Sequence, residues 1–199
     1  MRNLIILIAG LVTACGPPAR YIPPPEAKVT DFSREVNGSF DAVWSRVTNV
    51  AGATFFNIRN FDRGSGLMTL DYSNLKSVAP YVSCGTVSGG MPLVFVPGTQ
   101  QSSVFNYTTI KRIALQGTGN ITIRSLGPRR TLVQMNSLYT LTAYDLDADG
   151  ELQPFVEWKF TTQEPDVQVV PVDFLMTQIT CLPSYRLEQQ FLDAVSGPL

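Results

Sequence analysis

The stretch Val133-Gln-Met-Asn-Ser-Leu-Tyr-Thr-Leu-Thr-Ala143 alternates between two kinds of residue along its whole length. Its odd-numbered positions are mostly apolar, and its even-numbered positions are polar apart from Leu138. Successive side chains of a strand point to opposite faces of the sheet, so this stretch predicts a long strand with one buried face. The segment Val156-Glu-Trp-Lys-Phe160 repeats the pattern. Clean alternation of this kind is typical of antiparallel sheets that are open to water on one side.

Shorter segments around this strand show the same period of two. We expect a strand on each side of two turns rich in Gly, Pro, Asp and Ser, together with a less regular strand near the start of the domain. The predicted strands cover residues 29–36, 56–58, 68–72 and 121–123, and the turns cover residues 62–66 and 127–130.

Two segments follow the helical period instead. Ser39 is a favourable N-cap for the first helix, and Gly52 is expected to end it. Ser184 is expected to cap the second helix, which Gly197-Pro198 ends. The apolar positions at helical spacing are Phe40, Val43, Trp44, Val47 and Ala51 in the first helix and Leu187, Phe191, Leu192 and Val195 in the second. We therefore predict an α+β fold: a single antiparallel β-sheet with two amphipathic helices packed on one face.

The N-terminal segment, which begins Met1-Arg-Asn-Leu, has the pattern of an export signal. Arg2 is positive, and the apolar run Leu4–Val12 is too short for a permanent transmembrane helix, which needs about 20 apolar residues. The segment ends in Val12-Thr13-Ala14-Cys15, which resembles the lipobox of bacterial lipoproteins. The resemblance implies that residues 1–14 are a removed signal peptide and that Cys15 carries the lipid. The alternative is a buried strand that ends in cysteine.

The lipoprotein resemblance also implies a location. Gly16 follows the cysteine, where lipoproteins retained in the inner membrane commonly have Asp, so we expect a lipid anchor in the outer membrane, on its periplasmic face. Residues 15–28 are then a lipid-anchored, Pro-rich tether. As polyproline II, the part from Gly16 to Pro25 would reach about 30 Å. Residues 29–199 form a single globular α+β domain.

The domain contains an irregular insertion near residues 73–120. This segment is rich in Gly, Ser, Pro and Thr and includes the apolar cluster Met91-Pro-Leu-Val-Phe-Val96. Long segments with little periodicity are often functional; the alternative is an extra hairpin. An exposed apolar cluster must pack on its own domain or meet a partner, so we predict Met91, Leu93, Val94 and Phe95 as partner-binding residues.

The cysteines allow one intramolecular bridge. If Cys15 carries lipid, Cys84 and Cys181 remain as an even pair in an oxidising compartment, which predicts a disulfide. The alternative is two buried free thiols.

Two further patterns resemble a known family. The runs Ser39-Phe-Asp-Ala-Val-Trp-Ser-Arg46 and Arg63-Gly-Ser-Gly-Leu-Met-Thr-Leu70 resemble the globular domains of lipoproteins related to the β-barrel assembly accessory protein. The segment from Cys181 to Glu188 resembles a Cys-then-helix closure in small exported lipoproteins. The resemblance covers residues 36–72 and 180–195 and implies a binding or scaffolding domain without catalysis.

The composition limits the chemistry. The chain contains no His, which excludes Ser-His-Asp and Cys-His catalysis and His-rich metal sites, so we predict that the protein is not an enzyme. A net charge of −1 provides no general attraction to nucleic acid.

One acidic segment has the spacing of a metal loop. Asp145-Leu-Asp147-Ala-Asp149-Gly150 matches the first half of a calcium-binding loop, with alternate carboxylates and a Gly that permits the bend. Val156 stands where a bidentate Glu is wanted. We predict either a weak calcium site at Asp145, Asp147 and Asp149 or a polar hairpin turn, and no other cofactor.

These patterns favour a non-catalytic, lipid-anchored accessory or scaffold subunit of a cell-envelope complex, whose partners are the membrane and other envelope proteins. Besides the apolar cluster, the open sheet face is a candidate partner surface, with Gln134, Asn136, Leu138, Thr140 and Tyr144. The alternative function is a periplasmic small-ligand or calcium-binding lipoprotein, with the ligand between helices and sheet.

Overall fold

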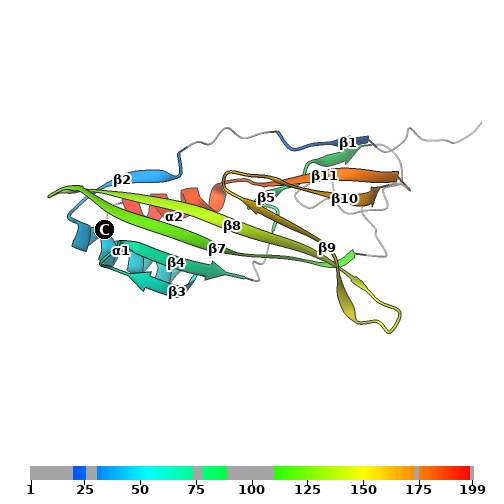
Figure 1. Ribbon diagram of the computed structural model, residues 1–199, viewed down its shortest axis with the longest axis horizontal. Coiled ribbons are helices and arrows are strands. Elements are labelled where there is room, and N and C mark those ends of the chain that lie inside the picture. Colours follow the sequence, from blue (N-terminus) through cyan, green and yellow to red (C-terminus); the bar gives the residue numbers. More distant parts are fainter. Residues whose placement is uncertain (1–19, 26–30, 74–77, 89–109, 173–174, 198–199) are drawn as a thin grey trace, which may run out of the picture.

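The computed structural model describes residues 20–25, 31–73, 78–88, 110–172 and 175–197. Its framework is mostly antiparallel β-sheet with two helices, in an α+β arrangement (Figure 1). The helices are α1 (Phe40–Ala53) and α2 (Arg186–Ser196). Within the described ranges, no helix combines the length and the apolar character needed to cross a membrane.

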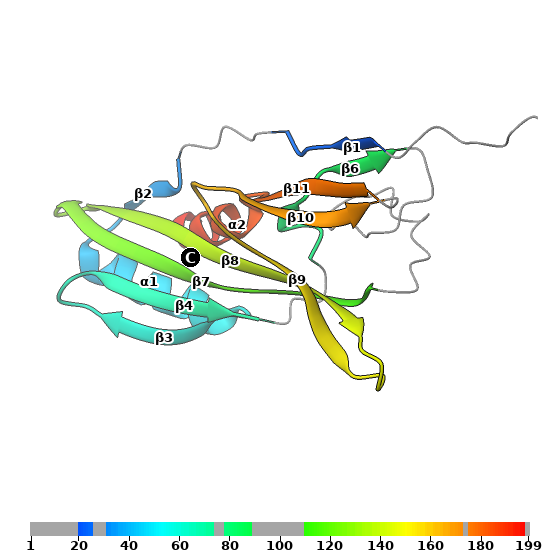
Figure 2. The same cartoon turned by 45° about the vertical axis from the view of Figure 1, so that its right-hand side comes forward.

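The strands do not form the single sheet that the sequence predicts. A six-stranded sheet has the order β2-β8-β7-β4-β3, with β9 also paired to β8; β10, β11 and β5 form a second sheet, and β1 and β6 a third. The separate groups arise because β9 leaves β8 and leads into the β10–β11 hairpin, which lies beside β1 and β6 (Figure 2). The strands are β1 (Arg20–Ile22), β2 (Ser33–Asn37), β3 (Asn57–Asp62), β4 (Leu67–Tyr72), β5 (Val82–Ser83), β6 (Thr86–Ser88), β7 (Ile110–Gly127), β8 (Arg130–Leu146), β9 (Leu152–Thr161), β10 (Asp166–Val172) and β11 (Leu175–Pro183).

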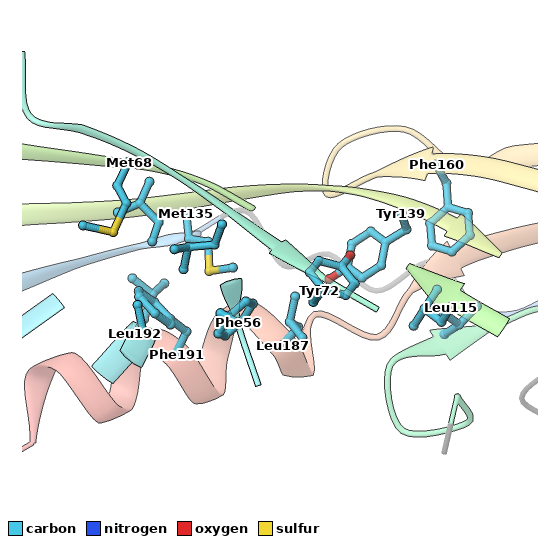
Figure 3. Packing of buried hydrophobic residues seen from close by; sticks show 14 of the residues in the cluster. Phe56, Met68, Tyr72, Leu115, Met135, Tyr139, Phe160, Leu187, Phe191 and Leu192 are labelled. Atoms are coloured by element: carbon cyan, nitrogen blue, oxygen red, sulfur yellow. The ribbon is translucent and has the colours of Figure 1, made fainter. Parts of the chain in front are cut away.

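The long strand β8 is the centre of the six-stranded sheet. Its odd-numbered side chains from Val133 to Ala143 are all buried, as the alternation predicts. All of them except Ser137 belong to one apolar cluster with residues of both helices, part of which is seen in Figure 3. Trp44 of α1 and Trp158 of β9 belong to this cluster and are 8% and 1% exposed, which confirms their predicted burial.

β7 begins earlier than predicted and shortens the expected insertion. Residues 110–120 pair with β8 from Asp145 to Asn136 and continue the ladder. The core-facing positions here include Gly117 and Gly119, whose lack of side chains hides the apolar alternation in the sequence. Gly117 leaves room for the ring of Tyr72, which crosses it and donates a hydrogen bond to the Leu138 carbonyl oxygen at 3.2 Å.

The sequence predicts the N-cap residue of α1 correctly but not that of α2. Ser39 caps α1, and its side chain accepts a hydrogen bond from the Ala42 N–H at 3.4 Å, as predicted. Ser184 does not cap α2: its hydroxyl donates to the Pro80 carbonyl oxygen at 2.5 Å, and Tyr185 occupies the N-cap position with φ 62°. A long-range contact thus replaces the predicted local one.

The predicted tether is corrected at residues 20–22. Arg20–Ile22 is not polyproline II but strand β1, which pairs antiparallel with β6. Pro24 is buried. The part of the chain that the structure describes therefore begins within the predicted tether, and it begins as a strand.

Candidate functional site

The open face of the six-stranded sheet carries a hollow. This hollow has a volume of about 420 Å³ and lies over β3, β4, β7 and β8. The side chains that line it from β7 and β8 are even-numbered, so the hollow faces away from the buried, odd-numbered side of the sheet. It is lined by Asn57, Arg59, Asp71, Tyr72, Ser73, Gln116, Gly117, Thr118, Leu138 and Thr140.

A bulge in the edge strand β3 places Arg59, the one cationic side chain among the described residues that line this hollow. The pairing of β3 with β4 shifts register between Ile58 and Asn60, which leaves Arg59 as the extra residue. Bulges of this kind redirect a side chain. Here Arg59 forms an ion pair with Asp71, with 2.8 Å between Nε and Oδ2.

Asp71 orients this arginine. Its Oδ1 accepts a hydrogen bond from the Thr118 hydroxyl at 3.0 Å, while its Oδ2 holds Arg59. Among the described residues, no partner is seen for the two terminal nitrogens of the Arg59 guanidinium. A guanidinium held through Nε keeps its outer donors for a carbonyl or carboxylate oxygen.

Leu138 is the apolar residue in this polar surrounding. Its side chain is 45% exposed, and its neighbours in the hollow include Thr118 and Thr140. The predicted open sheet face is therefore present, and the hollow includes two of its predicted residues, Leu138 and Thr140. Arg59 and Asp71 were missed, because the alternation of β3 gives no sign of a bulge.

A second polar group is buried between α2 and β8. Glu188 is 0% exposed, and its Oε1 accepts a hydrogen bond from the Tyr139 hydroxyl at 2.5 Å. Glu188 Oε2 and Ser137 Oγ have no hydrogen-bond partner in the described part of the chain. Because these groups lie inside the core, we assign them to the docking of α2 rather than to a binding site. The sequence holds a signal for this, since Glu188 interrupts the apolar stripe of α2.

Burial changes the ionisation of two tyrosines in this core. Burial raises the pKa of Tyr72 and of Tyr139 far above the ordinary value, and the nearby Glu188 carboxyl raises both further. Both hydroxyls therefore keep their protons in the folded protein under conditions where an exposed tyrosine ionises.

We expect an alkaline loss of stability from these two tyrosines. Their folded pKa lies above the unfolded value of about 10, so their contribution is complete below pH ~10 and is lost as pH rises further, by about 1.4 kcal/mol per pH unit for each group. Urea unfolding at increasing pH should show this fall in the free energy of unfolding. The Tyr72→Phe variant should show a smaller slope, because one of the two tyrosines that contribute to it is gone. Equal slopes for the variant and the natural protein would contradict the burial assignment.

The two predicted cysteines come together. Cys84 and Cys181 form a disulfide, although 97 positions separate them in the sequence, and both are fully buried. Cys15 lies outside the described residues, as do Met91, Leu93, Val94 and Phe95, so their predicted roles stay predictions.

The acidic segment forms the turn of the β8–β9 hairpin. Asp147 Oδ1 accepts hydrogen bonds from the backbone N–H groups of Asp149 and Glu151, at 3.0 and 2.9 Å. These backbone donors, that of Glu151 first, hold the pKa of Asp147 below its usual range. In the parts of the chain that the structure describes, no three acidic, Cys or His side chains gather as a metal site. Asp145, Asp147 and Asp149 are therefore not brought together, and calcium binding stays a prediction.

Comparison of the chain with family models, with curated proteins and with solved structures finds no match. The resemblance of residues 36–72 and 180–195 to β-barrel assembly accessory lipoproteins therefore stays a prediction.

Proposed function

We propose that this protein is a non-catalytic lipoprotein of the outer membrane, anchored through Cys15 on the periplasmic face, and that it serves as an accessory or scaffold subunit of a cell-envelope complex. Its partner would meet the open face of the six-stranded sheet at the hollow around Arg59. The signal-like N-terminus and the disulfide support export to an oxidising compartment. The lack of His in the chain supports a role in binding rather than in catalysis.

One observation carries the choice of surface. In the hollow, the oriented Arg59 and the exposed Leu138 are surrounded by side chains with amide and hydroxyl groups. Binding energy at protein interfaces concentrates in a few anchors, often Arg, that polar contacts surround. The hollow has this composition.

A second candidate function is the binding of a small ligand, and the size of the hollow favours it. Ligand pockets commonly measure about 300–1,000 Å³, and the hollow measures about 420 Å³. The sequence suggests a ligand between the helices and the sheet. In the described part of the chain, however, the apolar cluster occupies that space (Figure 3), so the ligand would bind in the hollow instead. An oxygen-rich polar molecule would suit the donors that line the hollow.

The test is photo-crosslinking in native envelopes. A photoreactive residue in place of Leu138 should capture a partner, whereas the same residue in place of Leu126, which is 39% exposed near the β7–β8 turn, should not. Arg59→Gln should reduce capture about tenfold, as expected for the loss of a charge-assisted hydrogen bond.

Arg63→Gln is the matched control for this charge change. Arg63 lies in the same β3–β4 hairpin but pairs with Asp41 at 2.6 Å and does not line the hollow, so capture should be unchanged. A protein adduct supports the scaffold, and an adduct of small mass supports the ligand-binding alternative. Equal capture from positions 138 and 126, or no effect of Arg59→Gln, would contradict the proposed surface.

A further inference from the structure

Strand β1, with which the described part of the chain begins, is held against β11 through Tyr21. The Tyr21 hydroxyl of β1 accepts a hydrogen bond from the Thr180 N–H at 3.0 Å and lies 3.2 Å from the Thr180 carbonyl oxygen and 3.1 Å from that of Cys84. Tyr21 thus occupies the edge of β11 beside the disulfide, since Cys84 is bonded to Cys181. Burial raises the pKa of Tyr21, consistent with a hydroxyl held against the domain.

The backbone directly before β6 leaves space for β1. Gly85 has φ +78°, and a Cβ on it would overlap the Ile22 carbonyl oxygen and lie 2.9 Å from the ring of Tyr21. Only glycine adopts this conformation readily and leaves this space. The close approach and the pairing of Arg20–Ile22 with Thr86–Ser88 make β1 part of the fold.

This attachment limits the distance between the lipid and the domain. Five residue steps join Cys15 to Arg20, and a fully extended chain spans at most about 3.6 Å per residue. Whatever path those residues take, the lipid-bearing cysteine lies within about 18 Å of the start of β1. A tether that remained free to Pro25 would allow about twice that distance.

Exposed apolar side chains lie at the same end of the domain. Val167 of β10 is 47% exposed and pairs with Thr180, the residue that Tyr21 holds from the other side. Val169 is 53% exposed and Ile22 is 47% exposed. Figures 1 and 2 both show β1, β6, β10 and β11 gathered at the end of the molecule away from α1 and β3.

We propose that this end, defined by Ile22, Val167 and Val169, rests on the lipid surface of the membrane that holds Cys15. The inference depends on the lipid anchor in the proposed function. Because the link from Cys15 to β1 is short, the surface that faces this end of the domain is the lipid bilayer. The exposed valines and isoleucine then contact the interface, as apolar side chains of membrane-bound proteins do. The hollow over β3, β4, β7 and β8 belongs to a different sheet and remains open to a partner.

The test uses the full-length mature protein in vesicles of phosphatidylethanolamine and phosphatidylglycerol. A fluorescent label is attached at Val169→Cys, where the native disulfide and the acylated Cys15 leave the new thiol as the reactive one. A second protein carries the label at Leu126→Cys, an exposed position near the distal β7–β8 turn. Spin-labelled lipid headgroups should quench the label at position 169 several-fold more than the label at position 126.

Releasing β1 should weaken this contact. Tyr21→Ala removes the attachment to Thr180, so quenching at position 169 should fall towards that at position 126 while the protein still floats with the vesicles. Val167→Cys, labelled in the same way, repeats the measurement if the label at position 169 disturbs β10.

The outcomes separate the two proposals. If the protein floats with the vesicles but both positions are quenched equally, the membrane contact is wrong and the anchor stands. If intact-mass analysis shows no acyl chains and the protein does not float, the anchor and the membrane contact fail together.

Discussion

Gly117→Ala should destabilise the protein by about 3 kcal/mol or more, because the core of the sheet has no space for one methyl group at this position. A Cβ on Gly117 would overlap the Leu138 carbonyl oxygen of the paired strand β8 and would lie 2.6 Å from Cζ of Tyr72. The Tyr72 ring can rotate away, but the carbonyl oxygen belongs to backbone. Relief therefore requires β7 and β8 to separate at the centre of the sheet. Urea or thermal unfolding of the variant measures the loss.

Gly52→Ala is the control, and we expect the opposite sign. Gly52 lies in the last turn of α1, and a Cβ there would meet no atom within 4 Å. Alanine in a helix is more favourable than glycine by about 0.5–1 kcal/mol, so this variant should be slightly more stable than the natural protein. A Gly117→Ala variant as stable as Gly52→Ala would show that β7 and β8 do not pair as described.

Removal of the disulfide should have an effect of similar size. Cys84 and Cys181 close a loop with a sequence separation of 97, and the chain-entropy model assigns about 4–5 kcal/mol to a loop of this length. The Cys84→Ala, Cys181→Ala double variant avoids leaving a single buried thiol. Denaturant unfolding should show a midpoint well below that of the oxidised protein.

The oxidised and reduced forms of the natural protein provide the comparison. The reductant should lower the stability of the natural protein to that of the double variant and should leave the double variant unchanged. A difference below about 1 kcal/mol would mean that the unfolded chain is hardly restrained by the bridge. Because Tyr21 lies beside the bridge, reduction should also increase hydrogen exchange at the backbone N–H of Thr180.

Local patterns were enough to predict much of the central sheet. The alternation from Val133 to Ala143 predicts both the strand and its buried face, because side chains on a strand must alternate. Ser39 and the helical spacing after it predict the start of α1 because capping depends on neighbouring residues. The pairing of Cys84 with Cys181 followed from counting, since the predicted lipid on Cys15 leaves two thiols.

Local patterns failed where contacts distant in sequence override the chain's own preference. Residues 111–120 look irregular because glycines occupy core positions, yet β8 provides the partner that makes them strand. Ser184 has the position of a helix N-cap in the sequence, but its hydroxyl donates a hydrogen bond to the Pro80 carbonyl oxygen instead. The segment Asp166–Pro183 contains β10 and β11, which are not among the predicted strands.

The candidate site divides in the same way. The sequence by itself determined that one sheet face is polar and includes Leu138 and Thr140, because the period of two assigns every residue of β8 to a face. Only the tertiary structure decided that a bulge turns Arg59 onto that face, where it pairs with Asp71, which in turn accepts a hydrogen bond from Thr118. It also decided that β1 is fastened beside the disulfide through Tyr21. Both features depend on contacts between residues more than ten positions apart, and the free energy of those contacts does not exist until the strands meet.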